Sequence, residues 1–331
     1  MRVLFWHVHG SWATSFVHGR QTTLIPVVPD RGPDGRGRPK TYDWPERAVE
    51  VPCDRLRDED VDVVVLQRPH ELQLTEEWLG RRPGRDVPAV YVEHDTPRRT
   101  ASDSGLPEEV VPNSRHFLSG RDDIPVVHVS HFNDLFWDCG RAPTTVIEHG
   151  VVDPGHRFKG TRPRAGVVIN DPLRRGRVTG TDLLPRLARA VPIDLFGMNV
   201  AEVPERLGVP HEAMWTFDDL PQRRMHAELA ARRVYLHPYR WTSLGLALIE
   251  AMMIGLPIVA LATTAAIEAV PPEAGVLTTN VGTLTEAARG LIADPPRARQ
   301  LGKEARVAAV ERYALPRFLR DWQRLLEEVT R

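Results

Sequence analysis

Residues 239–260 read YRWTSLGLALIEAMMIGLPIVA and form the most informative segment of this chain. An apolar run ends just before it, so the pattern predicts a strand, a turn of small residues over Thr242–Gly245, a helix over Leu246–Ile254 and a second strand. Strand, turn and helix in this order are typical of a parallel α/β sheet. The first backbone N–H groups of such a helix attract anions, because they lack partners and lie at the positive end of the helix dipole.

The same alternation of apolar strands and helical segments extends over the rest of the chain. Strands are predicted in the first half at Arg2–Val8, Val61–Gln67, Ala89–Glu93, Glu109–Pro112, Val126–Val129 and Thr145–Glu148. Strands are predicted in the second half at Ala165–Asn170, Ile193–Phe196, Met214–Phe217, Val234–His237, Pro257–Leu261 and Gly275–Thr278. Further helices are predicted at Thr181–Ala190, Pro221–Arg233 and Leu284–Ala293. Each half is therefore expected to form a doubly wound α/β domain.

The boundary between the two domains is predicted near Asp153–Pro163, where Gly, Pro and basic residues occur without periodicity. We assign residues 1–155 to the N-terminal domain and residues 156–316 to the C-terminal domain. Pro29–Pro45 is rich in Gly, Pro and Arg, which predicts a long surface loop or a mobile lid. Near the end of the chain a proline should separate two helices, of which the second, Phe318–Val329, is amphipathic.

Composition and charge exclude several classes of protein. Of the 331 residues, 42% are hydrophobic and 26% are charged, as in a globular protein with a substantial core. The net charge of −1 argues against a nucleic-acid-binding protein, and two cysteines cannot form a disulfide framework. Because we find neither a bilayer-spanning apolar stretch nor a signal peptide, we expect a cytoplasmic enzyme. Residues 156–331 hold 25 basic and 19 acidic side chains, which suits an anionic ligand or reflects scattered solvated charges.

The stretch LGLALIEAMMIGLPIVA, residues 244–260, resembles the signature of a known family. Residues 245–260 are similar to the pattern of the retaining glycosyltransferases of GT-B fold, family 4 (glycosyl transferases group 1). The matching positions are Gly245, Leu246, Glu250, Ala251, Met252, Gly255, Pro257, Val259 and Ala260. The resemblance implies two Rossmann-like domains with an interdomain cleft, and a helix of residues 317–331 that crosses back to the N-terminal domain. It also implies a nucleotide-sugar donor on the C-terminal domain and an acceptor mainly on the N-terminal one.

Within this signature the resemblance assigns donor contacts. Glu250 aligns with the carboxylate that binds the nucleotide ribose, and Ser243, Leu244 and Gly245 align with the turn whose backbone faces the donor. The carboxylate that faces the donor sugar in the family is replaced by Thr242, which still offers a hydroxyl group. A buried, unpaired carboxylate is costly, so Glu250 is expected to pair with a ligand hydroxyl or with a nearby arginine.

A basic segment, residues 170–184, resembles the part of the family that holds the donor diphosphate. Thr179 stands at the position of the family's lysine. We expect Arg175 and Arg177 to bind the phosphates instead, because guanidinium groups bind phosphate oxygens in bidentate pairs. The alternative is a solvated basic loop without a ligand.

Two strand ends of the N-terminal domain carry the other candidate residues. His94 and Asp95 resemble the family's strand-end His-Asp, so His94 is expected to hold the donor sugar or receive a proton, and Asp95 to orient it or contact the acceptor. Gly10, Ser11 and Trp12 follow the first strand, where the family has a glycine-containing loop near the phosphates and the acceptor. Trp12 is also a candidate platform for sugar stacking. The structural alternatives are a strand-end histidine without a ligand and a tryptophan in the core.

Other chemistries lack their motifs. The sequence contains no HExxH zinc motif, no P-loop and no Gly-x-Ser-x-Gly, and neither domain opens with Gly-x-Gly-x-x-Gly after its first strand. We therefore expect no metal site and no cofactor, and the nucleotide-diphosphate sugar is a substrate. We also expect that Mg²⁺ is not required, because Arg175, Arg177 and the helix dipole supply positive charge in its place.

The expected activity is retaining, metal-independent transfer of a hexose to a saccharide acceptor by front-face displacement. GDP-mannose is the first choice of donor, which makes the chain a mannosyltransferase, and a UDP-sugar is the alternative. A nucleotide-sugar epimerase or hydrolase of the same fold, and a non-catalytic protein that binds sugar nucleotides or glycans, are further alternatives. We expect no nucleic-acid partner, and a homo-oligomer is an open alternative.

Overall fold

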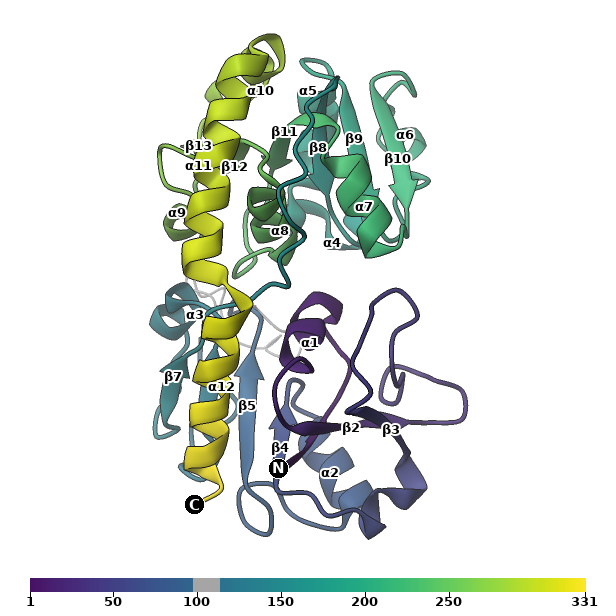
Figure 1. Cartoon of the computed structure of the whole chain (residues 1–331), viewed down its shortest axis with the longest axis vertical. Coiled ribbons are helices and arrows are strands. Elements are labelled where there is room, and N and C mark those ends of the chain that lie inside the picture. Colours follow the sequence, from purple (N-terminus) through teal and green to yellow (C-terminus); the bar gives the residue numbers. More distant parts are fainter. Residues whose placement is uncertain (98–113) are drawn as a thin grey trace, which may run out of the picture. The chain divides into compact units, whose positions relative to one another are not determined.

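The chain forms two compact units, each built on its own parallel β-sheet. The structure, a computed structural model, describes residues 1–97 and 114–331. One unit comprises Met1–Val152 and Leu315–Arg331, and the other comprises Asp153–Ala314 (Figure 1). The predicted α/β fold with two doubly wound sheets is therefore confirmed. The strand predicted at Glu109–Pro112 lies outside the described residues.

The first sheet has the strand order β3-β2-β1-β4-β5-β6-β7, and its strand pairs are all parallel. Its strands are β1 (Arg2–Phe5), β2 (Thr22–Val27), β3 (Ala48–Pro52), β4 (Val63–Leu66), β5 (Ala89–Glu93), β6 (Val126–His128) and β7 (Thr144–Val146). The central strand β4 reads VVVL and is buried along its whole length, as expected of a parallel strand covered on both faces.

The helices of the first unit include one from the far end of the chain. They are α1 (Gly10–Phe16), α2 (Glu71–Leu79), α3 (His131–Phe136) and α12 (Leu315–Val329), with a 3₁₀ turn at Cys53–Asp58. Phe318, Trp322 and Leu326 form the buried face of α12, as its amphipathic pattern predicts. Trp322 packs against Trp12 and Phe16 of α1, with ring centroids 5.6 and 5.2 Å apart. The last helix therefore completes the core of the first unit.

The sequence analysis did not predict β2, β3, α1 or α2. The long segment between β2 and β3, Pro29–Pro45, has no helix and only one isolated bridge to a strand, in agreement with the predicted loop. The structure shows the loop anchored rather than detached. Arg38 donates to the carbonyl groups of Pro45 and Ala48 (3.1 and 2.8 Å), and the indole of Trp44 is buried and donates to Thr14.

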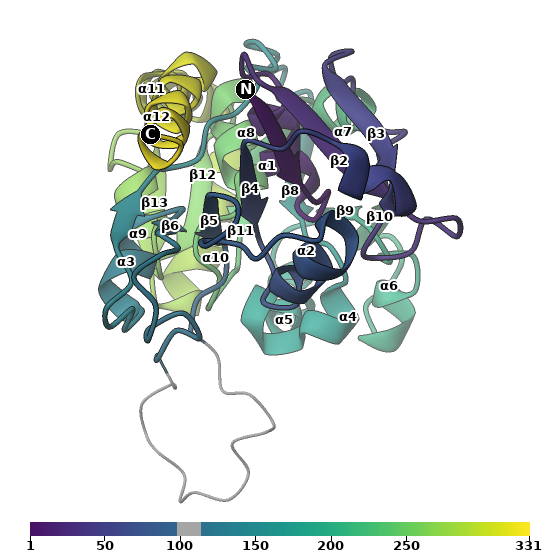
Figure 2. The ribbon, with the colours of Figure 1, turned by 90° about the horizontal axis from the view of Figure 1, so that it is seen from below.

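The second sheet has the order β10-β9-β8-β11-β12-β13 and is also parallel. Its strands are β8 (Arg162–Val168), β9 (Ile193–Gly197), β10 (Met214–Asp218), β11 (Arg232–His237), β12 (Ile258–Leu261) and β13 (Gly275–Thr278). Its helices are α4 (Pro172–Arg175), α5 (Leu184–Ala188), α6 (Val203–Arg206), α7 (Gln222–Leu229), α8 (Leu246–Ile254), α9 (Ala266–Ala269), α10 (Val281–Ala293) and α11 (Pro295–Tyr313), with 3₁₀ turns at Gly176–Thr179 and Thr181–Leu183. Two short helices, α4 and α5, follow β8 in the chain and can be found in Figure 2 by their teal colour.

Two predicted helices of this unit differ from the structure. The helix predicted to end at Arg233 ends at Leu229, because Arg232 already belongs to β11 and its buried guanidinium donates to Asp194 of β9 at 2.6 Å. The helix predicted over Thr181–Ala190 is a 3₁₀ turn followed by the short α5.

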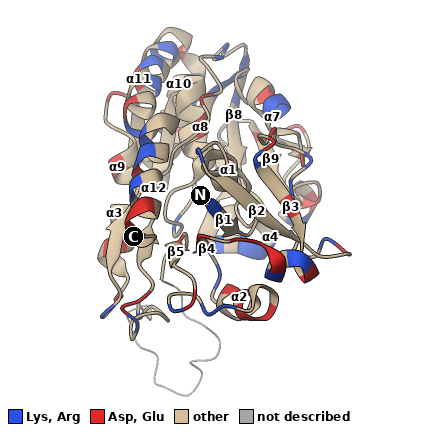
Figure 3. Ribbon diagram, turned by 60° about the horizontal axis from the view of Figure 1, so that its bottom comes forward, with Lys and Arg blue, Asp and Glu red and all other residues tan. Residues whose placement is uncertain are grey.

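Charged side chains are spaced along α11, where Figure 3 shows several Lys and Arg.

Helix α8 lies in the interior of the second unit. Every residue from Leu248 to Ile254 is buried, as expected of a helix that is apolar on all sides. Gly255 ends the helix with φ +96°, a conformation that strongly favours glycine. A Cβ at Gly302 of α11 would lie 2.0 Å from the Gly255 carbonyl oxygen, so the backbones of α11 and α8 are in direct contact there.

Candidate functional site

The donor-side candidates of the second unit lie at the carboxyl ends of β8 and β11, which are neighbours in the sheet. The segments that follow these strands are joined by their backbones: the N–H groups of Arg240 and Trp241 donate to the Val178 carbonyl at 2.9 and 3.2 Å. Gly180 has φ +74°, and a Cβ there would lie 2.0 Å from the Pro238 carbonyl oxygen. The loop that contains Val178 and Gly180 and the loop at residues 238–241 are therefore packed directly against each other at this edge of the sheet.

The start of α8 has the geometry of the predicted anion site. Its N-cap is Gly245, with an extended backbone (φ −72°, ψ 118°), and in the part of the chain covered by the structure no side chain caps it. The buried His237 lies directly below, since a Cβ at Gly245 would meet its ring at 3.0 Å. A first turn without a cap presents N–H groups to an anion, which the helix dipole favours.

The turn before α8 offers its main chain more than its side chains. Ser243 and Leu244 are 4% and 8% exposed, and the Ser243 carbonyl accepts a hydrogen bond from the N–H of Ala265 at 3.2 Å. Thr242 is half-buried. The predicted backbone contacts of Ser243, Leu244 and Gly245 with a donor therefore agree with the geometry, and they stay a prediction.

Glu250 is 2% exposed and has partners that the sequence analysis did not name. Its Oε1 accepts a hydrogen bond from Nε2 of Gln222 at 3.0 Å, and its Oε2 lies 3.0 Å from Nε2 of His226. Both partners lie on α7, four residues apart and therefore on one face of the helix. The side chains of α7 thus hold the carboxylate in place without a ligand.

The two arginines predicted to bind phosphate differ in their surroundings. Arg177 is 77% exposed and pairs with Asp182 at 3.0 Å. The half-buried Arg175 lies with its guanidinium carbon 5.8 Å from the ring centre of Tyr239, and we find no ion pair for it among the described residues. Tyr239 is fixed in turn, because its hydroxyl donates to the Val168 carbonyl at 3.0 Å. Arg175 is therefore the better placed of the two to receive an anion.

Thr179, at the position of the family's lysine, does not face solvent. Its side chain is fully buried, and its hydroxyl lies 3.0 Å from that of Thr181. The Thr181 hydroxyl donates to the Pro172 carbonyl at 2.8 Å. This pair of threonines stabilises the turn that carries the arginines.

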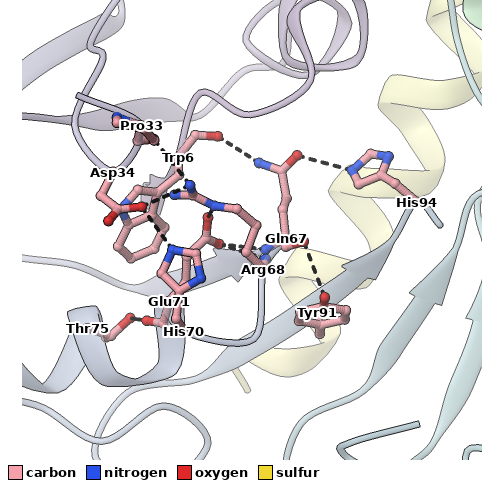
Figure 4. Close-up of polar contacts among 10 residues, drawn as sticks. All are labelled: Trp6, Pro33, Asp34, Gln67, Arg68, His70, Glu71, Thr75, Tyr91 and His94. Atoms are coloured by element: carbon pink, nitrogen blue, oxygen red, sulfur yellow. Dashed lines mark hydrogen bonds and ion pairs between the residues drawn. The ribbon is translucent and has the colours of Figure 1, made fainter. Parts of the chain in front are cut away.

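In the first unit, His94 directly follows β5 and contacts Gln67, which directly follows β4. Nε2 of His94 lies 3.1 Å from Oε1 of Gln67, as Figure 4 shows. Burial lowers the pKa of His94 well below its usual 6.5, and the nearby His9 and His149 lower it further. His94 is therefore a neutral imidazole at pH 7, able to accept a hydrogen bond or a proton.

Asp95 is exposed, and its backbone is held on both sides. Its N–H donates to Oε1 of Glu93 at 2.7 Å, and its carbonyl accepts hydrogen bonds from the indole of Trp137 at 2.8 Å and from Asn133 at 3.2 Å. The segment that carries His94 and Asp95 is thus rigid at its end.

The segment predicted as a glycine-containing loop is a helix. Gly10, Ser11 and Trp12 form the first turn of α1. Trp12 is 1% exposed and packs between Phe16 and Trp322, so the expectation that it stacks on a sugar is wrong. Its ring edge also meets His94, with ring centroids 5.1 Å apart, so this core residue supports the candidate histidine.

Two more histidines complete the surroundings of His94. The ring centroid of His9 lies 4.1 Å from that of His94. His149 is buried, its Nδ1 has no hydrogen-bond partner within residues 1–97 and 114–331, and burial lowers its pKa to about 3. Arg317 of α12 donates to the Glu148 carbonyl at 3.0 Å and to the His149 carbonyl.

The sequence analysis missed Gln67, Gln222 and His226. Gln67 is a polar residue that directly follows a strand of four apolar residues, at the sheet edge where ligands bind in this fold. Gln222 and His226 are separated by one helical turn, and that spacing was a signal for a shared partner. Neither pattern identifies the residue that is contacted, and only the tertiary structure shows that Gln67 meets His94 and that Gln222 and His226 meet Glu250.

The described residues contain neither a candidate metal site nor a candidate membrane span. We find no group of three or more His, Cys, Asp or Glu side chains there that could hold a metal ion. None of the helices in this part of the chain is both long and apolar enough to cross a bilayer.

Comparison with known proteins gives a family match and several structural matches. Residues 189–294 match the family model described as glycosyl transferases group 1. No sequence among the curated proteins matches the chain.

Solved structures of similar fold extend over the whole chain. Sucrose-phosphate synthase from Thermosynechococcus elongatus has a TM-score of 0.72 at 13% identity, and 99% of each chain is covered. Anabaena HepE in complex with UDP-glucose has a TM-score of 0.66 at 15% identity, covering 99% of this chain and 100% of that one. A glycosyltransferase from Rickettsia africae has a TM-score of 0.64 at 13% identity, covering 99% and 98%.

These matches confirm the resemblance stated from the sequence and the expected class of enzyme. The segment that carries the signature matches glycosyl transferases group 1, and both sheets match the fold of GT-B glycosyltransferases.

Proposed function

We propose that this chain is a retaining, family 4-like hexosyltransferase that moves a hexose from a nucleotide-diphosphate sugar to a saccharide acceptor. The second unit binds the nucleotide-sugar, and the first unit supplies His94 and contacts for the acceptor. The observation that carries the proposal is the start of α8, where an uncapped helix N-terminus lies in the family signature and the segment that follows β8 carries Arg175.

The assigned roles follow from charge and geometry. The N–H groups at the start of α8 and the guanidinium of Arg175 bind the two phosphates and stabilise the negative charge that grows on the leaving group. Glu250, held by α7, accepts hydrogen bonds from the ribose hydroxyls. Positive charge is thus supplied by the protein, which supports a reaction that does not require Mg²⁺.

Front-face displacement requires no nucleophile from the protein. The anomeric carbon–oxygen bond to the diphosphate breaks, and the nucleotide diphosphate leaves with the electron pair. The acceptor hydroxyl oxygen bonds to the same face of the anomeric carbon, and its proton passes to the departing phosphate oxygen. Thr242 in place of a carboxylate supports this route, because a double displacement requires a nucleophile on the sugar side.

For the donor we propose a UDP-sugar, since the complexes of Anabaena HepE contain UDP, UDP with glucose, or UDP-glucose. GDP-mannose, favoured by the sequence likeness alone, is the competing donor.

The first experiment is thermal denaturation with UDP, GDP, ADP and their sugar nucleotides, with and without Mg²⁺. A ligand at 100 times its Kd stabilises the folded state by about 2.7 kcal/mol. We expect stabilisation by uridine nucleotides that does not depend on Mg²⁺, and loss of that stabilisation in Arg175→Ala. Anomeric ¹H NMR of the product, from a donor of known configuration, then tests retention.

A second candidate is a non-catalytic protein that binds sugar nucleotides, which the replacement of the sugar-side carboxylate by Thr242 favours. Stabilisation by a nucleotide-sugar, with neither transfer nor hydrolysis over a panel of saccharide acceptors, would support it over the transferase. No stabilisation by any nucleotide would remove both candidates.

A further inference from the structure

Gln67 is held at every polar atom that it has. It is 5% exposed. Its side-chain Nε2 donates to the carbonyl of Trp6 at 2.7 Å, and its Oε1 faces Nε2 of His94 at 3.1 Å. Its backbone N–H donates to Oε2 of Glu71 at 2.6 Å, and its carbonyl accepts from the hydroxyl of Tyr91 at 3.2 Å. Figure 4 shows the amide lying between the Trp6 carbonyl and the His94 ring.

These contacts allow only one orientation of the amide. The Trp6 carbonyl can only accept a hydrogen bond, so the NH₂ group of Gln67 must face it and the amide oxygen must face His94. An amide oxygen can only accept, so Nε2 of His94 must carry the proton. A neutral His94 then has its lone pair on Nδ1.

We propose that Gln67 is a positioning residue that fixes His94 in the Nε2-protonated form and aims Nδ1, as a hydrogen-bond acceptor, at a hydroxyl group of the sugar substrate. This inference rests on the proposed function only for the identity of the substrate. The tautomer itself follows from contacts inside the first unit.

A buried carboxylate holds Gln67 from behind. Glu71 is fully buried, and besides the Gln67 N–H its oxygens accept hydrogen bonds from the backbone N–H of Arg68 at 3.2 Å and from Nε of Arg68 at 2.7 Å. Arg68 also pairs with Asp34 of the Pro29–Pro45 loop at 2.9 Å. An interior carboxylate needs such partners, and these contacts fix the main chain at Gln67.

The direct test is ¹⁵N NMR of the histidine rings, which distinguishes a protonated from an unprotonated ring nitrogen. In the wild-type chain at pH 7, with His94→Asn used for assignment, we expect Nε2 of His94 protonated and Nδ1 unprotonated. Gln67→Met keeps the length of the side chain and removes both hydrogen bonds, so it should give a mixture of the two tautomers.

Kinetics provide the second readout. We expect kcat of Gln67→Met to fall at least ~10-fold, with KM for the donor within about 2-fold, since misplacing a hydrogen bond that orients the sugar costs rate more than binding. Thr75→Val is the matched control, because it removes a buried hydrogen bond to the Glu71 carbonyl, at 2.7 Å, without touching His94.

The outcomes separate this inference from the proposed function. A proton on Nδ1 in the wild-type chain, or an unchanged tautomer in Gln67→Met, overturns the role of Gln67 whatever the activity. A loss of kcat in Thr75→Val equal to that in Gln67→Met also overturns it, since the effect is then one of stability. The expected tautomers in a chain that transfers no sugar support the role of Gln67 and count against the transferase alone.

Discussion

His149 makes the first unit sensitive to acid, and the size of the effect can be calculated from its burial. The side chain is 3% exposed, its Nδ1 has no partner among the described residues, and burial lowers its pKa from 6.5 to about 3. In the unfolded chain the imidazole regains its ordinary pKa. The unfolded state therefore binds the proton more tightly than the folded state does.

The sign follows from this difference. Because the folded pKa of His149 lies below its unfolded pKa, the free energy of unfolding is highest above pH 6.5 and falls as the pH drops from 6.5 towards 3. Between pH 7 and pH 5 the unfolded imidazole becomes almost fully protonated while the folded one stays neutral. This difference lowers the free energy of unfolding by about 2 kcal/mol.

The substitution His149→Asn isolates this contribution. We expect the loss of stability between pH 7 and pH 5 to be smaller by about 2 kcal/mol in His149→Asn than in the wild-type chain. Urea unfolding at both pH values, followed by tryptophan fluorescence, measures it, and His131→Asn controls for loss of an exposed imidazole from the same unit. An identical pH dependence in His149→Asn and wild type would refute the reasoning, because His149 would then not be held neutral by burial.

Three further predictions concern the second unit. Arg175→Ala should weaken nucleoside diphosphate binding by about 1.5–3 kcal/mol, the value of a hydrogen bond to a charged group. Arg177 is exposed and paired with Asp182, so Arg177→Ala should change the binding free energy by less than about 0.5 kcal/mol. Equal losses of affinity in the two variants, measured by calorimetry, would contradict the assignment. Glu250→Ala should lower nucleotide affinity by at least ~2 kcal/mol, and unchanged affinity in a folded variant would remove Glu250 from the site. Gly180→Ala should destabilise the unit by at least ~2 kcal/mol, because φ is +74° and the new Cβ would lie 2.0 Å from the Pro238 carbonyl oxygen; an unchanged Tm would show that the loop adapts.

Most of the second sheet could be predicted from the sequence, because its strands are short apolar runs separated by helical periods. The start of α8 was predictable for the same reason: a small-residue turn stands between a strand and an apolar helix. The error at Arg232 has a tertiary cause. From the sequence, an arginine at this position is expected on the exposed face of a helix. In the structure it is buried, because Asp194 of the neighbouring strand accepts its hydrogen bond at 2.6 Å. In the first unit, β2 and β3 were missed because their polar and proline residues hide the period of a strand.

The candidate site was predictable where one segment of sequence builds it and not where distant segments meet. Gly245 and Glu250 come from a single signature. The side chains that fix Glu250 lie on α7, and Gln67, which contacts His94, follows β4. Each contact joins elements that are distant in sequence and meet only in the folded chain. Trp12 could not be assigned from the sequence, because an aromatic side chain suits sugar stacking as well as core packing. Its packing against α12 in the structure shows that it belongs to the core.

The position of α12 determines the order in which the two units can be completed during synthesis. Residues 1–152 leave the ribosome before residues 153–314, but Trp12 and Phe16 lack their partners on α12 until Phe318 and Trp322 have been made. The second unit, Asp153–Ala314, is contiguous in sequence and can fold before the first unit receives α12. Residues 1–152 therefore expose an aromatic surface until α12 has been made, and they are the part of the chain that we expect a chaperone to bind.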